Sequence, residues 1–458
     1  MKLTIHEVAK VVEAINDVCQ YQDLEIISVE FDTRKVVPGS LFVPLKGQRD
    51  GHDFIQEAIK QGAVATFWGK ELQDASSEIA VIQVLDPLAA MQQLAIYYRQ
   101  KMQPDVIAIT GSNGKTTTKD MTAAVLASDY KTYKTQGNYN NEIGLPYTIL
   151  SMPDDTEKLI LEMGMEYPGD LHLLSTIAKP NIAVITLIGE SHLKFFKTRA
   201  NITKGKFEIT DSLEKNGMLI IPENEPLLRP FTQQLSQKVI TFGMDNVSDL
   251  QAKVISKGKM QTAFTLNFLD GEFTIPISGN YNVKNALIAA FIGQQMKVSL
   301  EKIRESLKNV QLAQSRTEWL ATSEGVEILS DVYNANPTAM KLVLKSFAQM
   351  PTDGRRIVVL GDMLNLGENS REFHENLATN LHPNTIQSLF LYGEEMANLY
   401  QVLKTKYPEK TVFYYPANEK AKLIQAVKAY IRPKDLVMLK ASNGMGFKEI
   451  VDALIRTC

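Results

Sequence analysis

A short segment that can bind phosphate is the most informative part of the sequence. The apolar run 106–110 leads into the turn TGSNGKTT, in which Gly111 and Gly114 allow backbone N–H groups to point inward. A helix beginning after this turn would add partial positive charge at its N-terminus, and Lys115 adds a full charge. Thr116 can bind Mg²⁺. Together these features predict a site for the phosphates of a nucleoside triphosphate.

The spacing of this loop differs from the usual pattern G-x-x-x-x-G-K-[ST], because Ile109 stands where the first glycine belongs. The alternative interpretation is a tight turn that carries an exposed lysine. We favour the phosphate site, since an apolar strand precedes the turn, and we infer ATP binding. The residues expected to contact the nucleotide here are Gly111, Ser112, Asn113, Gly114, Lys115, Thr116 and Thr117.

Two more polar side chains follow apolar runs in the same region. Glu162 ends the run KLILE, and His192 comes a few residues after NIAVITLIG. Ligands bind at the carboxyl ends of strands in open α/β sheets, so both are candidates for holding one or two Mg²⁺ ions. Each also has a structural explanation, as a cap or loop carboxylate and as a structural histidine, and histidine is an unusual Mg²⁺ ligand. In NITKGKFEI, spacing does not separate Lys204 from Lys206.

The overall composition excludes several classes of protein. The chain has 458 residues, 44% hydrophobic and 22% charged, and its net charge of -3 gives no field that attracts nucleic acid or an acidic membrane. Two cysteines, Cys19 and Cys458, cannot form a disulfide framework. We find no signal peptide and no apolar run of the ~20 residues that a membrane span needs. We expect a soluble, cytoplasmic monomer without nucleic-acid or membrane partners.

The order of apolar and amphipathic segments predicts an α/β protein of three domains. Residues 1–102 form a small mixed α/β domain that starts with a helix over 4–15. Residues 103–312 form a parallel-sheet domain of the phosphate-loop type, extended by antiparallel strands within 251–277. Residues 313–458 alternate again and form a Rossmann-like domain.

Motifs along the whole chain resemble those of one enzyme family. They are TGSNGKTT, LEMG, ESHL, TKGKFEI, GNYNVKNALIAA and DVYNANP. This set resembles the Mur ligases, the ATP-dependent amide ligases that build the peptide stem of bacterial peptidoglycan. FDTR, SLFVPLKGQRDGHDF and TQGNYNNEIGLP are most similar to the members that join D-alanyl-D-alanine to UDP-N-acetylmuramoyl-tripeptide. The resemblance spans all three predicted domains.

This resemblance implies a two-step reaction in peptidoglycan precursor synthesis. ATP phosphorylates the free carboxylate of the UDP-linked tripeptide, and the amine of D-alanyl-D-alanine then attacks the acyl phosphate. The chemistry is reasonable, because a carboxylate is a poor electrophile until its oxygen becomes a phosphate leaving group. Lys115 would hold phosphates. The implied Mg²⁺ ligands are Thr116, Glu162, His192 and Lys206, the last after carbamoylation by CO₂.

The resemblance also implies contacts with both large substrates. Arg316 would bind phosphates, Asp331 the ribose, and nearby asparagines the adenine; this nucleotide set is Asn282, Asn285, Arg316, Asp331, Asn334 and Asn336. The UDP-sugar would be bound by Asp32, Thr33, Arg34, Lys46, Gly47, Arg49, Asp50, Gly51 and His52. The path toward the reacting carboxylate would be lined by Asn138, Asn140 and Asn141.

Some positions depart from the family pattern. Leu187 replaces a usual Asn, Asn365 a common Glu, and Ala441 and Asn443 a frequent Gly and Arg. These departures leave the contacts to the incoming amine, and any role of Ser442, undefined. The alternatives to the leading hypothesis are an amino-acid-adding muramoyl ligase, a folylpolyglutamate-type ligase, and a nucleotide-dependent regulator that makes no amide. The DTR and DGHDF segments disfavour the folate version.

Overall fold

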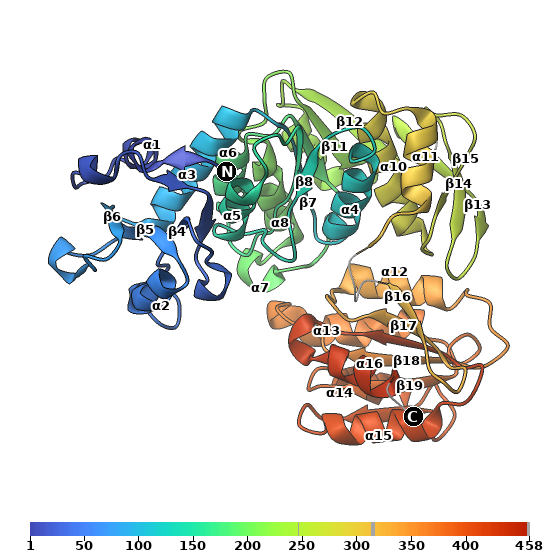
Figure 1. The fold of residues 1–458 in the computed structure, drawn as a ribbon. Coiled ribbons are helices and arrows are strands. Elements are labelled where there is room, and N and C mark those ends of the chain that lie inside the picture. The colour runs from blue at the N-terminus through green and yellow to red at the C-terminus, as the bar shows by residue number, and fades with distance from the viewer. Residues whose placement is uncertain (246, 313–316, 456–458) are drawn as a thin grey trace.

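The structure is a computed structural model that describes residues 1–245, 247–312 and 317–455. Three parts follow one another along the chain, each built on its own larger sheet. In Figure 1 the N-terminal part lies at one end of the central part, and the C-terminal part lies below the central part. No helix in the described residues is both long and apolar enough to cross a membrane.

The N-terminal part contains a four-stranded parallel sheet in the order β3-β4-β5-β6. The first helix is shorter than the predicted 4–15, because Thr4 caps it and Glu13 adopts a positive φ of 53° that ends it. This prediction of the helix end was wrong. The elements are β1 (Leu3–Thr4), α1 (Ile5–Val11), β2 (Glu25–Ile26), β3 (Ser28–Glu30), β4 (Ser40–Phe42), α2 (Ile55–Lys60), β5 (Ala63–Trp68), β6 (Ala80–Gln83) and α3 (Pro87–Met102).

The central sheet has nine strands in the order β15-β14-β13-β12-β11-β10-β7-β9-β8. In this order, neighbouring strands from β13 to β8 are parallel, and those from β15 to β13 are antiparallel, as predicted. The turn 269–272 joins β14 to β15. The strands are β7 (Asp105–Thr110), β8 (Thr132–Lys134), β9 (Lys158–Glu162), β10 (Ile182–Ile185), β11 (Met218–Pro222), β12 (Lys238–Gly243), β13 (Leu250–Lys257), β14 (Thr262–Leu266) and β15 (Glu272–Ile275).

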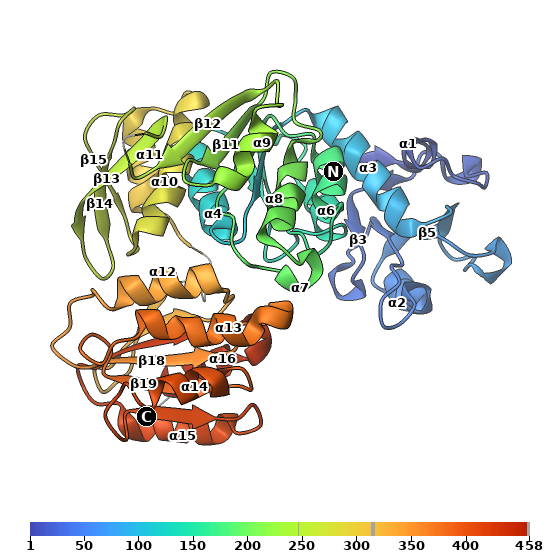
Figure 2. The ribbon, with the colours of Figure 1, turned by 180° about the vertical axis from the view of Figure 1, so that it is seen from behind.

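Helices cover both faces of the central sheet, which explains why its strands are apolar throughout. On β7, Val106 and Ala108 pack toward α3, α5, α6 and α8, whereas Ile107 and Ile109 pack toward α4, α10 and α11. The two layers can be followed in Figures 1 and 2. The helices are α4 (Lys115–Leu126), α5 (Gly144–Ser151), α6 (Asp170–Ala178), α7 (Leu193–Phe196), α8 (Arg199–Phe207), α9 (Arg229–Thr232), α10 (Asn280–Gln295) and α11 (Leu300–Lys308).

The C-terminal part has a six-stranded sheet in the order β16-β17-β21-β18-β19-β20. Its strands are parallel except the edge strand β16, which the sequence analysis did not identify. The elements are β16 (Glu318–Ala321), β17 (Glu327–Asp331), α12 (Pro337–Phe347), β18 (Arg356–Gly361), α13 (Ser370–Glu375), β19 (Ser388–Tyr392), α14 (Met396–Leu403), β20 (Val412–Tyr415), α15 (Lys420–Tyr430), β21 (Leu436–Lys440) and α16 (Phe447–Ile455).

Each sheet lies within one of the ranges 1–102, 103–312 and 313–458, and these boundaries themselves stay a prediction. Helix α3 connects the first two parts rather than belonging to one alone. Tyr98 donates a hydrogen bond to the backbone oxygen of Met152, and Arg99 donates one to that of Ile177. The N-terminal part is therefore anchored to the central part by its last helix.

Candidate active site

The phosphate loop lies between β7 and α4, as the sequence predicts. Gly111 has a φ of 148°, and a Cβ there would lie 1.9 Å from Thr186 Oγ1. Gly114 has a φ of 86°, and its Cβ would lie 2.8 Å from Asn285 Oδ1. Lys115 Nζ donates to Gly111 O at 2.7 Å across the turn. Both glycines are thus required by backbone conformation and by close neighbours.

Two cavities meet at this loop, and Asn113, Tyr333 and Asn334 line both of them. The first has a volume of about 360 Å³ and lies between the central and C-terminal parts. The second has a volume of about 510 Å³ and extends over the carboxyl ends of β7 and β9. The phosphate loop therefore separates two spaces with different linings.

The first cavity combines an apolar wall with hydrogen-bonding groups. Leu187 lies in this wall, in place of the Asn usual in the family. Lys440 Nζ donates to Asp331 Oδ2 at 2.5 Å and to Asn334 O at 2.9 Å, so the end of β17 is fixed. The predicted nucleotide residues found in this wall are Asn113, Gly114, Thr117, Asn282, Asn285, Asp331 and Asn334. This lining suits a nucleobase and a ribose next to the phosphate loop.

The second cavity has a buried carboxylate at its base. Glu162 accepts hydrogen bonds from Thr116 Oγ1 at 2.7 Å and from Asn140 Nδ2 at 2.9 Å, and it is 3% exposed. Lys115, His192 and Lys206 line the same cavity. The structure thus brings all four predicted catalytic residues together, although they come from four separate segments.

Two of these side chains, His192 and Lys206, are largely buried. Burial, with the nearby charges of Lys115 and Lys206, lowers the pKa of His192 to about 4, and its Nδ1 has no hydrogen-bond partner in the described residues. Burial and the charge of Lys115 hold the pKa of Lys206 well below its usual range. The His192 ring is therefore neutral at pH 7, and burial shifts Lys206 toward its neutral amine form.

A divalent cation fits this set of groups. Glu162 and Thr116 offer oxygen donors, and His192 offers a buried, unpartnered nitrogen. In the described part of the chain, no three His, Cys, Asp or Glu side chains gather to enclose a metal. Mg²⁺ commonly keeps several waters and substrate oxygens and takes few protein ligands, so a sparse donor set is what such an ion requires.

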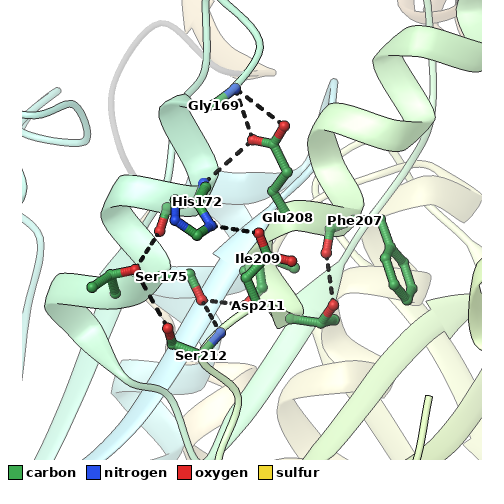
Figure 3. Close-up of polar contacts among 10 residues, drawn as sticks. Gly169, His172, Ser175, Phe207, Glu208, Ile209, Asp211 and Ser212 are labelled. Carbon is green, nitrogen blue, oxygen red and sulfur yellow. Dashed lines mark hydrogen bonds and ion pairs between the residues drawn. The ribbon is translucent and has the colours of Figure 1, made fainter.

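Figure 3 shows a cluster of hydrogen bonds between α6 and the segment that follows α8, which the sequence analysis did not identify. Both Glu208 carboxylate oxygens accept from Gly169 N at 3.1 Å, and one also accepts from His172 N at 3.3 Å, at the start of α6. His172 Nδ1 lies 2.7 Å from Asp211 Oδ2, and Ser175 Oγ donates to Ile209 O. The end of α8, which carries Lys206, is thus fastened to α6. The signal in the sequence was Glu208 within TKGKFEI.

The loop 138–141 connects the second cavity with the N-terminal part. Asn138, Asn140 and Asn141 line the cavity, and their predicted place along the path to the reacting carboxylate stays a prediction. Tyr139 between them contacts the N-terminal part instead, where its hydroxyl accepts from Lys35 Nζ at 2.7 Å and its ring meets Phe31 edge to face. This aromatic contact was another feature that the sequence analysis did not identify.

The predicted UDP-sugar residues lie in neither cavity. They follow β3 and β4, whose carboxyl ends share one edge of the N-terminal sheet. Asp32 pairs with Arg34, whose side chain is 86% exposed. Asp50 contacts Lys70 and His52, which hold the pKa of its carboxyl well below the usual range. The residues at this edge are Asp32, Thr33, Arg34, Lys46, Gly47, Arg49, Asp50, Gly51 and His52.

Two predicted nucleotide residues in the described part of the chain, Thr116 and Asn336, line neither cavity. Arg316 lies outside the described residues. Asn336 lines neither cavity; it is 1% exposed and caps α12, where its Oδ1 accepts from Ala339 N at 2.9 Å. Asn443 lines the second cavity, and the neighbouring Ser442 Oγ accepts from Leu364 N.

The fold and site together define an ATP-dependent amide ligase of three parts. Sequence models of three domains match the chain: the Mur ligase family catalytic domain at residues 25–99, the Mur ligase middle domain at 109–293, and the Mur ligase glutamate ligase domain at 315–443. The chain belongs to the Mur ligase family.

Relatives and solved structures agree with this assignment. The chain is 39% identical to UDP-N-acetylmuramoyl-tripeptide--D-alanyl-D-alanine ligase of Bacillus subtilis, over 100% of this chain and 99% of that protein. It is 31% identical to the Escherichia coli protein of that name, over 97% of each. A crystal structure of MurF from Acinetobacter baumannii covers 100% of this chain and 99% of its own, with TM-score 0.89 and 26% identity. MurF ligase from Thermotoga maritima in complex with ADP gives 0.81 at 26% identity, covering 94% and 97%.

Proposed function

We propose that this enzyme joins D-alanyl-D-alanine to UDP-N-acetylmuramoyl-tripeptide with ATP, through an acyl phosphate, in the cytoplasm and as a monomer. The observation that carries the proposal is the second cavity, in which Lys115, Glu162, His192 and Lys206 converge beside the loop 138–141. The names and near-complete coverage of the relatives support the choice of substrates.

In this proposal the nucleotide lies across both cavities. The base and ribose occupy the first cavity, between α10 and the end of β17. The terminal phosphate passes the phosphate loop into the second cavity, where Lys115 neutralises part of its charge. The UDP-sugar lies along the carboxyl edge of the N-terminal sheet, which leaves the peptide to extend past loop 138–141. Lys115 and the backbone N–H groups of the phosphate loop would then stabilise the charge that develops during phosphoryl transfer.

Magnesium would be held by Thr116, Glu162 and His192, together with a carbamoylated Lys206. Bound Mg²⁺ supplies charge stabilisation for the phosphates during transfer. Lys206 is suited to carbamoylation because burial and the charge of Lys115 lower the pKa of its amine, which favours the nucleophilic neutral form, and because no described side chain forms an ion pair with it. A carbamate there would place a second anionic oxygen ligand beside Glu162 in the same cavity.

The experiment is an amine-dependence assay with the purified full chain. Release of ADP and phosphate is measured with UDP-N-acetylmuramoyl-tripeptide and ATP in the presence of D-alanyl-D-alanine, single amino acids or no amine. Tripeptides with lysine or diaminopimelate at the third position are both assayed. We expect release with the dipeptide only. Release with single amino acids, or with glutamate and a folate, would favour another ligase reaction, and amine-independent behaviour would favour a regulator.

A further inference from the structure

The N-terminus of α12 contacts the phosphate loop across the junction of the central and C-terminal parts. Asn336 Nδ2 donates to Asn113 Oδ1 at 2.7 Å and to Ser191 Oγ at 2.8 Å. At the same time Asn336 Oδ1 accepts from Ala339 N, so one side chain caps its own helix and binds the other part. Figures 1 and 2 show α12 on the side of the C-terminal part that faces the central part.

Asn113 is well placed to pass this contact on to the nucleotide site. It lines both cavities, and its backbone oxygen accepts from Thr186 Oγ1 at 2.5 Å. The direction of the Asn113 amide is therefore set by a residue 223 positions away in the chain. Asn336 itself lines neither cavity, so its effect on the nucleotide is indirect, through Asn113 and Ser191 and through the docking of the two parts.

A second contact secures the same helix end. Glu190 Oε2 accepts from Thr338 N at 3.1 Å and from Thr338 Oγ1 at 2.7 Å. The carboxylate lies at the N-terminus of an eleven-residue helix, where the helix dipole favours an anion. The segment 189–191 is in turn bound to the phosphate loop, because Gly189 N donates to Ser112 Oγ at 2.9 Å. Loop, segment and helix end thus form one connected network.

We propose that Asn336 is a positioning residue that docks the C-terminal part onto the phosphate loop and orients Asn113 before the nucleotide binds. Docking creates the first cavity, whose wall comes from both parts, so a docked enzyme binds nucleotide without first having to close. The expected effect on nucleotide binding rests on the proposed function, whereas the docking itself does not.

The test is Asn336→Ser in the full chain. Serine caps a helix about as well as asparagine, so α12 and the thermal stability should be kept, but its short side chain cannot reach Asn113. Both native cysteines are first replaced by serine, and a cysteine is introduced at each of the exposed positions Lys215 and Lys406 to carry a dye. Single-molecule fluorescence energy transfer between the two dyes then reports the distance between the central and C-terminal parts. We expect a shift toward longer distances without ligand and an ADP affinity about tenfold lower, as the loss of two hydrogen bonds would give.

Thr338→Val tests the second contact independently, because it removes one donor to Glu190 and keeps the side chain's shape. Its matched control is Thr379→Val, at an exposed threonine elsewhere in the C-terminal part. For Thr338→Val we expect a smaller shift of the dye-to-dye distance, again toward longer distances, and for the control we expect no shift. A wild-type distance distribution in Asn336→Ser would overturn the proposal, whatever its ADP affinity. These readouts need no ligase turnover, so failure of the proposed function would be seen separately, in the amine-dependence assay.

Discussion

At the scale of single residues, the sequence alone cannot tell which of Lys204 and Lys206 is buried in the site. They lie two positions apart in one basic segment, yet Lys206 is 2% exposed in the second cavity and Lys204 is exposed on α8. The difference arises from how α8 packs against the sheet, and a helix of nine residues gives too short a pattern to fix its buried face from sequence alone.

We predict that Lys206→Ala abolishes ligase activity, lowering kcat by about a thousandfold or more if the lysine is needed to organise the charge on the phosphates. Excess bicarbonate should not restore activity, because no amine remains to be carbamoylated. Lys204→Ala is the matched control and should retain wild-type turnover. Full turnover in Lys206→Ala, measured as ADP release with the dipeptide, would remove this lysine from the mechanism.

A second prediction at this scale concerns Gly111. An added Cβ would lie 1.9 Å from Thr186 Oγ1 and 3.1 Å from Leu187 N, so Gly111→Ala must displace the phosphate loop. We expect ADP affinity, measured by calorimetry, to fall at least tenfold. Gly325→Ala is the control, since Gly325 also has a positive φ but nothing within 4 Å of its Cβ position. It should lose about 1–2 kcal/mol of stability while keeping its ADP affinity.

At the scale of elements, parallel strands account for what could be predicted. Glu162 ends β9 and His192 follows β10. These two strands flank β7 and its phosphate loop, so their carboxyl ends had to share an edge. The edge strand β16 and the early end of α1 were missed, because each depends on tertiary pairing or on one residue's backbone angle. Hydrogen bonds such as Asn336 to Asn113 join distant segments, and no local pattern encodes them.

The contact between α6 and the turn after α8 gives a third prediction. Glu208 accepts the backbone N–H groups of Gly169 and His172, which α6 cannot satisfy internally. Glu208→Ala should cost about 1 kcal/mol of stability, as the loss of a helix cap does. It should also lower kcat, because the end of α8 that carries Lys206 is released.

Glu214→Ala provides the control for this change. Glu214 forms a partly exposed ion pair with Lys179, so its removal should change thermal stability and kcat little. If Glu208→Ala lost stability but kept wild-type kcat, the cluster would hold the fold without positioning Lys206. Melting temperature and kcat, measured on both variants, separate these results.

At the scale of the whole molecule, Glu30 links the N-terminal and central parts and makes their contact sensitive to pH. Tyr147 OH donates to Glu30 Oε2 at 3.0 Å, and burial raises the pKa of the Glu30 carboxyl above its usual 4.5. Between 4.5 and the raised value, the folded protein retains a proton that the unfolded chain has lost. The contribution of Glu30 to stability therefore falls as the pH rises through this window.

We predict that Glu30→Gln reduces this dependence. Glutamine does not titrate and can still accept the tyrosine hydroxyl, so the melting temperature of the variant should fall less than that of the wild type as the pH rises from about 4.5 toward neutrality. The measurement is a series of thermal melts at closely spaced pH values. Identical pH profiles for the two proteins would contradict the prediction.

The hydrophobic cores divide the chain unequally. One core runs without interruption from the N-terminal sheet through α3 into one face of the central sheet, whereas the main cores of the C-terminal part are built from its own strands and helices. The C-terminal part should therefore behave as an exchangeable module. Chimeras that take it from a relative should fold, whereas exchanging residues 1–102 alone would require compensating changes beneath α3. In this family, recombination would then preserve the first two parts as one inherited unit.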